Sequence, residues 1–203
     1  MSAARAHTAG RPWKGVALLV VISSPSGGGK STVIRRLRQR HPEFFYSVSV
    51  TTRAMRAGEK QGQHYDFVTP VTFERLVRND QFVEWARVHS DYYGTPRKNI
   101  ERARRARRVL LFDIDVQGAE SLRAAEPSVV SIFLQPPSWT VLRDRLQGRG
   151  SETIQQQRLR LRTARLELSR RSEYDYWVTN DDLATCVADC EAIIRAEMLR
   201  RRE

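Results

Sequence analysis

A glycine-rich stretch at residues 24–32, SPSGGGKST, constrains the fold more than any other part of the chain. A run of apolar, partly β-branched residues precedes it at positions 16–22, and Val33, Ile34 and Leu37 follow it at helical spacing. A strand, a glycine-rich loop and a helix in this order are the context of a phosphate-binding loop. The glycines let backbone N–H groups turn toward phosphate oxygens, and the helix brings its positive dipole end to the same place. The stretch therefore predicts a site for a phosphorylated ligand.

Two residues at the end of this loop carry charge and metal chemistry. Lys30 can reach the outer phosphates of a nucleotide, and the Ser31 hydroxyl can be a ligand of Mg²⁺. The stretch departs once from the pattern G-x-x-x-x-G-K-[ST], because Ser24 replaces the first glycine, whereas Gly29 and the Lys-Ser pair are intact. The alternative is a glycine-rich surface turn beside an incidental lysine. We expect the whole loop to hold the nucleotide phosphates, through Ser24, Pro25, Ser26, Gly27, Gly28, Gly29, Lys30, Ser31 and Thr32.

A carboxylate opposite the loop is the second requirement of Mg²⁺-dependent phosphoryl transfer. Four apolar residues at positions 109–112 end in Asp113, which is the placement expected at the carboxyl end of a buried strand. Asp113 is therefore the predicted metal ligand. Asp115 lies two residues further on and is a second candidate, for the metal or for arginines of the substrate site; the alternative that it caps the following helix stays open.

Strands and helices alternate at both ends of the chain, which is typical of an α/β fold with a parallel sheet. Residues 46–95 instead contain mostly short strands and turns, which indicates an insertion with a small mixed sheet of its own. We expect strands at residues 44–50, 64–68, 82–88, 109–112, 129–134 and 176–178, and a turn and loop at residues 89–95. We expect further helices at residues 70–79, 96–108, 117–125, 138–146, 154–171 and 183–200.

The length and the charge limit the class of protein. The chain has 203 residues, which suits one domain or a core with a sizeable insertion. Lys and Arg number 35 against 23 Asp and Glu, and the net charge of +12 fits a partner that carries phosphate, whether nucleotide or nucleic acid. The densest basic cluster, residues 97–108, is interpreted as a solvated helix face, and the basic motifs of the known nucleic-acid-binding modules are missing. We therefore expect no nucleic-acid partner.

The distribution of apolar residues and cysteines favours the cytoplasm. No apolar run approaches the roughly 20 residues of a membrane span, so we expect no membrane partner. Residues 1–14 lack the apolar segment of a secretory signal, and we interpret them as a disordered lead-in. Cys186 and Cys190 lie in phase with the apolar residues of the last helix, so we expect them in the core and predict no zinc site.

Seven segments together make the chain resemble guanylate kinase in their order and spacing, from about residue 16 to the C-terminus. They are residues 24–32 (SPSGGGKST), 49–59 (SVTTRAMRAGE), 84–85 (EW), 92–95 (YYGT), 113–118 (DIDVQG), 148–150 (GRG) and 180–182 (NDD). The combination is specific, although no single segment is. The resemblance implies an enzyme that transfers the terminal phosphoryl group of ATP to GMP, and to dGMP as well, with Mg²⁺ as cofactor and ATP and GMP as partners.

The same resemblance implies how the chain is divided. It implies a phosphate-loop NTPase-type parallel core at residues 15–45 and 96–203, interrupted by a small mixed-sheet GMP-binding insertion at about residues 46–95. A mobile helical lid is implied at about residues 148–165. Met55 stands where the family commonly has proline, which can loosen that turn.

Carried over by position, the resemblance implies a role for each site residue. The positions that hold the guanine base match Ser49, Glu84 and Thr95. The positions that hold the GMP phosphate match Arg53, Arg56, Tyr65 and Tyr93, with Asp113 beside the substrate. Lid positions near the ATP phosphates match Arg149 and Arg160, the latter flanked by Arg158 and Arg162, and a position near the adenine matches Asn180. The implied catalytic set is Lys30, Arg53, Arg149, Arg160 and Asp115.

Elementary chemistry agrees with these roles. A guanidinium donates two parallel hydrogen bonds, which suits a dianionic phosphate. The nucleophile is already an anionic phosphate oxygen and needs no general base, so we interpret His41, His64 and His89 as structural. A carboxylate only accepts, so Glu84 can take both donors of guanine, N1–H and the amine, while the Ser49 and Thr95 hydroxyls can donate to its O6.

Two other classes of phosphate-loop protein remain as alternatives. The first is an inactive guanylate-kinase-like module that binds proteins, but such modules typically lose the loop, and here Lys30, Ser31 and Asp113 are present. The second is a phosphate-loop kinase of another small phosphorylated substrate, which Glu84 and the block at residues 49–56 argue against.

Overall fold

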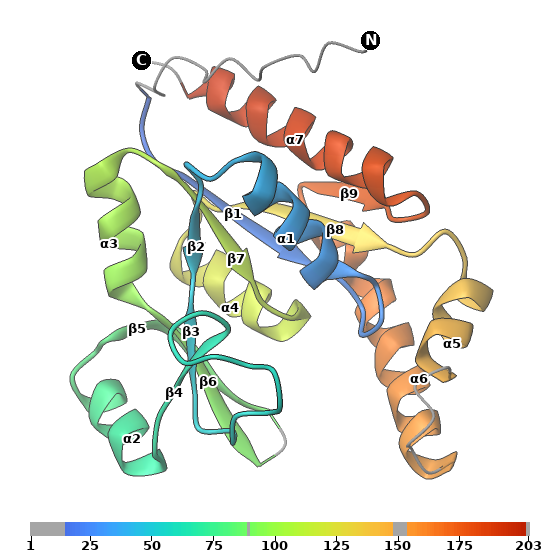
Figure 1. Ribbon diagram of the computed structural model, residues 1–203, viewed down its shortest axis with the longest axis horizontal. Coiled ribbons are helices and arrows are strands. Elements are labelled where there is room, and N and C mark those ends of the chain that lie inside the picture. The colour runs from blue at the N-terminus through green and yellow to red at the C-terminus, as the bar shows by residue number, and fades with distance from the viewer. Residues whose placement is uncertain (1–14, 89, 148–153, 202–203) are drawn as a thin grey trace, which may run out of the picture.

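The computed structural model describes residues 15–88, 90–147 and 154–201, and it confirms the predicted α/β fold with a parallel core sheet. Five strands form this sheet in the order β2-β7-β1-β8-β9, and all neighbouring strands run parallel (Figure 1). The strands are β1 Leu18–Ser23, β2 Phe45–Ser47, β7 Val109–Asp113, β8 Val130–Gln135 and β9 Tyr176–Thr179. Because the strands share one direction, the loops that follow them meet at one edge of the sheet.

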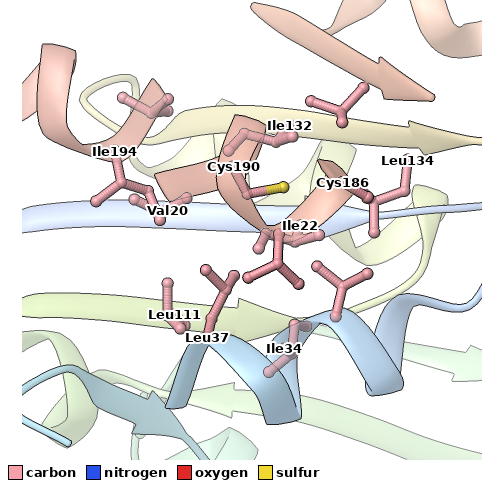
Figure 2. Close-up of a cluster of buried hydrophobic side chains, with 14 of the residues drawn as sticks. Val20, Ile22, Ile34, Leu37, Leu111, Ile132, Leu134, Cys186, Cys190 and Ile194 are labelled. Carbon is pink, nitrogen blue, oxygen red and sulfur yellow. The ribbon is translucent and has the colours of Figure 1, made fainter. Parts of the chain in front are cut away.

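The central strand β1 is buried on both faces. Its alternate residues belong to two separate clusters, as the two-residue repeat of a strand requires. Val20 and Ile22 pack with side chains of α1 and α7 (Figure 2), whereas Leu19 and Val21 pack with side chains of α3 and α4. The helices are α1 Lys30–Arg40 and α7 Leu183–Arg200 on one face, and α3 Arg97–Ala106 and α4 Val116–Ala125 on the other. The sheet therefore lies between two helical layers.

A second, mixed sheet of four strands has the order β4-β3-β6-β5. Its strands are β3 Ser49–Thr51, β4 Tyr65–Phe67, β5 Phe82–Val88 and β6 Asp91–Pro96. Strand β3 runs parallel to β4 and antiparallel to β6, which also pairs antiparallel with β5. Helix α2, Pro70–Arg78, follows the Thr69 cap and packs Phe73 against Val50 and Phe82. A small mixed sheet is what the sequence predicts for the middle of the chain, and this sheet also has a small core of its own.

Two further helices lie across the loop that follows β1, on the side away from the second sheet. Figure 1 places α5 (Trp139–Gln147) and α6 (Ile154–Ser169) opposite the second sheet and α2, with the segment after β1 between them. Leu142 and Leu146 of α5 pack against Ala164 of α6. Within the described residues, none of the helices is both long and apolar enough to cross a membrane.

The prediction of a turn and loop at residues 89–95 is wrong from residue 91 onward, whereas Ser90 is a turn and residue 89 lies outside the described residues. Residues 91–96 form strand β6, which pairs with β5 from Asp91 opposite Val88 to Pro96 opposite Phe82. Gly94 and Pro96 make the segment look like a loop, but antiparallel pairing on both sides overrides these local signals. Gly94 is needed there because a Cβ at this position would lie 2.8 Å from the Phe82 ring.

The single strand predicted at residues 44–50 is two strands in two different sheets. Strand β2 pairs with β7 in the core sheet, and β3 pairs with β4 and β6 in the second sheet. Val48 alone separates them, and its carbonyl oxygen accepts a hydrogen bond of 3.1 Å from the Asn99 side chain. The second sheet therefore begins at Ser49 and ends at Pro96.

Two predicted helices are shorter than expected. The basic helix predicted at residues 96–108 runs from Arg97 to Ala106, because Pro96 belongs to β6 and Arg107 adopts a left-handed conformation with φ 50°. Helix α6 ends at Ser169, and residues 170–173 continue as the 3₁₀ helix η1.

The basic cluster and the cysteines behave as the sequence predicts. The cluster at residues 97–108 is largely solvated, and part of it forms ion pairs, Arg104 with Glu126 and Arg105 with Glu101. Cys186 and Cys190 are fully buried in the cluster of Figure 2. The predicted lead-in at residues 1–14 lies outside the described residues.

Candidate active site

The glycine-rich loop joins β1 to α1, as its sequence predicts. Gly29 caps the first turn of α1 in a left-handed conformation, φ 87°, which favours glycine. A Cβ at Gly29 would also collide with the side-chain amide of Asn180. Ser24, at the position of the missing first glycine, is buried, and its hydroxyl donates to the Pro25 carbonyl oxygen at 3.0 Å. The serine is therefore accommodated inside the loop.

The loop forms one wall of a cleft with a volume of about 840 Å³. All nine loop residues, 24–32, line this cleft. The opposite walls come from the end of β5, through Arg87 and Val88, and from the start of α4, through Asp115. The remaining wall comes from α6 and from the first residue of η1. It consists of Leu159, Arg160, Thr163, Leu166, Glu167 and Arg170. The cleft thus brings together residues from four separate parts of the chain.

Lys30 and Asp113 meet at the base of the loop. Asp113 ends β7, directly beside β1, where it pairs with Ile22. The Lys30 ammonium lies 2.9 Å from Asp113 Oδ1 and donates to the Ile114 carbonyl oxygen at 2.7 Å. The side chains of both residues are less than a fifth exposed. The predicted carboxylate is therefore next to the phosphate loop, as the sequence pattern requires.

Asp115 caps α4, which is the alternative that the sequence left open. Its Oδ1 accepts a hydrogen bond of 2.8 Å from the Gly118 N–H. Asp115 also lines the cleft, and its charge helps to raise the pKa of Glu84. Its predicted catalytic role stays a prediction, and the cap explains its position without it.

The three residues predicted to hold a guanine base lie on neighbouring strands of the second sheet. Ser49 is on β3, Thr95 on β6 and Glu84 on β5, and Glu84 pairs with Thr95 in the register. The Thr95 hydroxyl donates to Glu84 Oε1 at 2.5 Å. Burial raises the pKa of Glu84 to about 7, against a smaller lowering by this hydrogen bond. In this arrangement the Thr95 hydroxyl orients the Glu84 carboxylate, and Ser49 carries the second hydroxyl of the predicted base site.

The residues predicted to hold a GMP phosphate surround Arg53. Its guanidinium makes two hydrogen bonds to Glu59, at 2.8 and 3.0 Å. This hydrogen bonding holds the pKa of Glu59 below its usual value. The Tyr65 and Tyr93 rings contact edge to face, with centroids 5.9 Å apart, and the Arg53 guanidinium lies 5.5 Å from the Tyr65 ring. Burial and the charge of Asp113 raise the pKa of Tyr65 to about 12, so its hydroxyl stays a neutral donor.

Arg56 occupies the exposed turn after Arg53. Its backbone N–H donates to Glu59 Oε2 at 2.8 Å, so one carboxylate holds both the Arg53 guanidinium and the Arg56 peptide. No role for Glu59 is predicted from the sequence. The signal that could have revealed it is local, a carboxylate three residues after Arg56 in a turn.

The phosphate loop is held from outside by side chains of two distant segments. Asn180, predicted to lie near the adenine, is buried, and its amide donates to the Gly28 carbonyl oxygen at 2.7 Å. Arg160 Nη2 donates to the Ser26 hydroxyl at 3.3 Å, and the Ser26 N–H donates to Glu167 Oε2 at 3.1 Å. Burial raises the pKa of Glu167. The predicted lid residue Arg149 lies outside the described residues.

Comparison with known proteins decides the family. The family model described as guanylate kinase matches residues 17–197. The chain belongs to the guanylate kinase family. Guanylate kinases from Carboxydothermus hydrogenoformans and Agrobacterium fabrum are 42% and 46% identical to it, over 183 and 185 residues. These matches cover 90% and 91% of this chain, and 90% and 84% of the two relatives.

A solved structure agrees with this assignment. The crystal structure of guanylate kinase from Anaplasma phagocytophilum has a TM-score of 0.74 and 39% identity, and the match covers 91% of this chain and 88% of that chain. The predicted resemblance is thus confirmed. As a member of the guanylate kinase family the chain is an enzyme, a nucleoside monophosphate kinase that uses ATP to phosphorylate GMP. The roles of its individual residues stay predictions.

Proposed function

We propose that the reaction takes place in one site with two halves, in which the phosphate loop holds ATP and the second sheet holds GMP or dGMP. The observation that carries the choice of substrate is the half-buried Glu84 carboxylate, held by the Thr95 hydroxyl at 2.5 Å. A carboxylate accepts two hydrogen bonds, and guanine offers N1–H and an amine on one edge. Adenine would place the acceptor N1 against Glu84. We include dGMP because the proposed contacts are to the base and the phosphate.

In the GMP half, Arg53, Arg56, Tyr65 and Tyr93 are proposed to bind the phosphate. The bidentate pairing of Arg53 with Glu59 supports this role, because it fixes the guanidinium before a substrate arrives. Tyr65 and Tyr93 add neutral hydroxyl donors beside that guanidinium. The dianionic phosphate would therefore meet a positive charge that is already in position.

In the ATP half, Lys30, the loop N–H groups and Arg160 are proposed to hold the phosphates, and Arg149, which lies outside the described residues, is proposed to assist them. Mg²⁺ takes oxygen ligands and is usually bound through one or two carboxylates and the substrate phosphates. Asp113 and Ser31 supply a carboxylate and a hydroxyl beside the loop, so the donor set fits. When bound, the ion would neutralise charge on the transferred phosphoryl group.

The chemical step needs positioning more than proton transfer. An oxygen of the GMP phosphate attacks the γ-phosphorus of ATP and forms the new P–O bond. The bond from this phosphorus to the oxygen of the β-phosphate breaks, which leaves GDP and ADP. Lys30 and the arginines stabilise the charge that moves toward the β-phosphate, and closure of the lid over the substrates would keep water from competing as a nucleophile.

A substrate panel tests this proposal. ADP release is followed in a coupled assay with GMP, dGMP, AMP, CMP and UMP as acceptors. We expect turnover with GMP and dGMP, and kcat/KM values lower by roughly 10⁴ for the other three, because a site built around hydrogen bonds rejects the wrong partner. A preference for AMP would overturn the proposed substrate.

The variant Glu84→Gln tests the base contact within the same assay. We expect it to lose most of the preference for GMP, because an amide replaces one acceptor by a donor. Glu74→Gln is a matched control, since Glu74 is an exposed carboxylate on α2. An unchanged ratio of GMP to AMP in Glu84→Gln would remove Glu84 from the base site.

A further inference from the structure

Glu167 is a carboxylate that reaches into the phosphate loop from a distant helix. Its Oε2 accepts a hydrogen bond of 3.1 Å from the Ser26 N–H, although the two residues are 141 positions apart. Ser26 is the third residue of the nine in the loop, where backbone N–H groups serve as ligands of anions. The carboxylate therefore holds a peptide that belongs to the ATP half of the site.

The same loop residue is held a second time from the same helix. Arg160 Nη2 donates to the Ser26 hydroxyl at 3.3 Å. Arg160 and Glu167 are seven positions apart on α6, so they lie two turns apart on one face of the helix. Helix α6 thus contacts Ser26 at both its side chain and its peptide, and the loop cannot shift at Ser26 without straining both contacts.

The surroundings of Glu167 keep it inside the site rather than on the surface. It lines the cleft together with the loop and Lys30. Burial raises its pKa, while the Ser26 N–H and the charge of Lys30 lower it. A half-buried carboxylate with a backbone donor and a nearby cation is placed to fix the loop, and no other carboxylate of α6 within the described residues could replace it.

We propose that Glu167 is a positioning residue for phosphoryl transfer, which acts by holding the Ser26 peptide and so ties the phosphate loop to α6. This inference rests on the proposed role of the loop as the ATP site. The proposed role depends on the hydrogen bond from the Ser26 N–H and not on the charge. An uncharged side chain of the same length that accepts this bond should therefore substitute for the carboxylate. The GMP half lies on the second sheet and is not touched by Glu167.

Three substitutions separate the hydrogen bond from the charge and from packing. Glu167→Gln keeps the length and an acceptor, Glu167→Asp keeps the charge but is one methylene shorter, and Glu167→Ala removes both. We expect kcat within about threefold of the wild type for Gln, and a loss on the order of 10–100-fold for Asp and Ala, because a displacement of about 1 Å can cost 10²-fold. KM for ATP should rise in Asp and Ala, and KM for GMP should stay unchanged.

The controls make the outcome decisive. Glu74→Ala, on the exposed face of α2, should match the wild type in every constant. Melting temperatures are measured for all variants, and rates are compared well below them. Wild-type kcat and KM for ATP in folded Glu167→Asp or Glu167→Ala would overturn the proposal, and so would a loss in Glu167→Gln as large as in Glu167→Ala. Either result leaves the proposed function standing, because that function is tested separately by the acceptor panel with the wild type and by Glu84→Gln.

Discussion

Glu84 should make the use of GMP depend on pH in a way that can be assigned to one residue. Burial raises its pKa to about 7, and the charge of Asp115 adds to this, while the Thr95 hydroxyl acts in the opposite direction. In the proposed site guanine donates two hydrogen bonds to Glu84, so the productive form of Glu84 is the carboxylate. In the free enzyme that form should be about half populated at pH 7 and about a tenth populated at pH 6.

The expected profile follows from these populations. The ratio kcat/KM for GMP reports ionisation in the free enzyme, so Glu84 alone should raise it about fivefold between pH 6 and pH 7 and less than twofold between pH 7 and pH 8. The phosphate of GMP also titrates, with a pKa near 6. Glu84→Gln keeps the titration of the phosphate but lacks that of the carboxylate. The quotient of wild type over Glu84→Gln therefore isolates Glu84, and a quotient that is flat from pH 6 to pH 8 would refute the reasoning.

The same ionisation should appear in the stability of the free protein. The folded protein prefers neutral Glu84, because its pKa in the fold lies above the usual 4.5. Stability from this residue is present below about pH 4.5 and is lost as the pH rises through 7. The shift corresponds to about 3 kcal/mol at most. Urea unfolding of both proteins at pH 5 and pH 8 checks the sign: the wild type should lose stability relative to Glu84→Gln at the higher pH.

Three other substitutions test the remaining parts of the site and the fold. Lys30→Ala should lower turnover by about 10²–10³-fold while the protein stays folded, because one charge contact to the transition state is worth roughly 3–4 kcal/mol; near-normal turnover would remove the loop from the reaction. Asp113→Asn should lose activity and recover only in part at high Mg²⁺, and an unchanged Mg²⁺ dependence would make Asp113 a structural strand end. Gly94→Ala should lower the free energy of unfolding by about 1–3 kcal/mol, since its Cβ would lie 2.8 Å from the Phe82 ring; urea denaturation measures the loss, and an unchanged midpoint would show that the ring moves freely.

Much of the ATP half could be predicted because its residues are close together in the sequence. The phosphate loop is contiguous from residue 24 to 32, and its glycines and lysine act at fixed offsets. Asp113 could be placed because a continuous apolar run of four residues points to a strand that is buried on both faces, and the structure buries all four. In both cases the prediction needs only residues that are neighbours in the sequence.

Glu167 and strand β6 could not be predicted, because their positions depend on contacts between distant segments. Glu167 lies in a charged helix, and nothing near it in the sequence shows that Ser26 is its partner. Strand β6 contains Gly94 and Pro96, which locally favour a loop, and only its pairing with β3 and β5 makes it a strand. The change of sheet at Val48 could not be predicted for the same reason, because Asn99, which donates to the Val48 carbonyl oxygen, follows 51 residues later.

The connection between the two sheets at Val48 is one residue long. This residue joins β2 to β3, α3 starts directly after β6, and the Asn99 side chain donates to the Ser47 hydroxyl and the Val48 carbonyl oxygen. A residue spans at most about 3.6 Å, so the two sheets cannot separate at this connection.

Strand β5 joins the second sheet to the core a second time. Val83 of β5 packs against the core cluster that contains Leu19 and Val21, and Arg87 and Val88 at its end line the cleft together with Asp115. The position of the second sheet over the cleft therefore depends on β5 as well as on the Val48 connection.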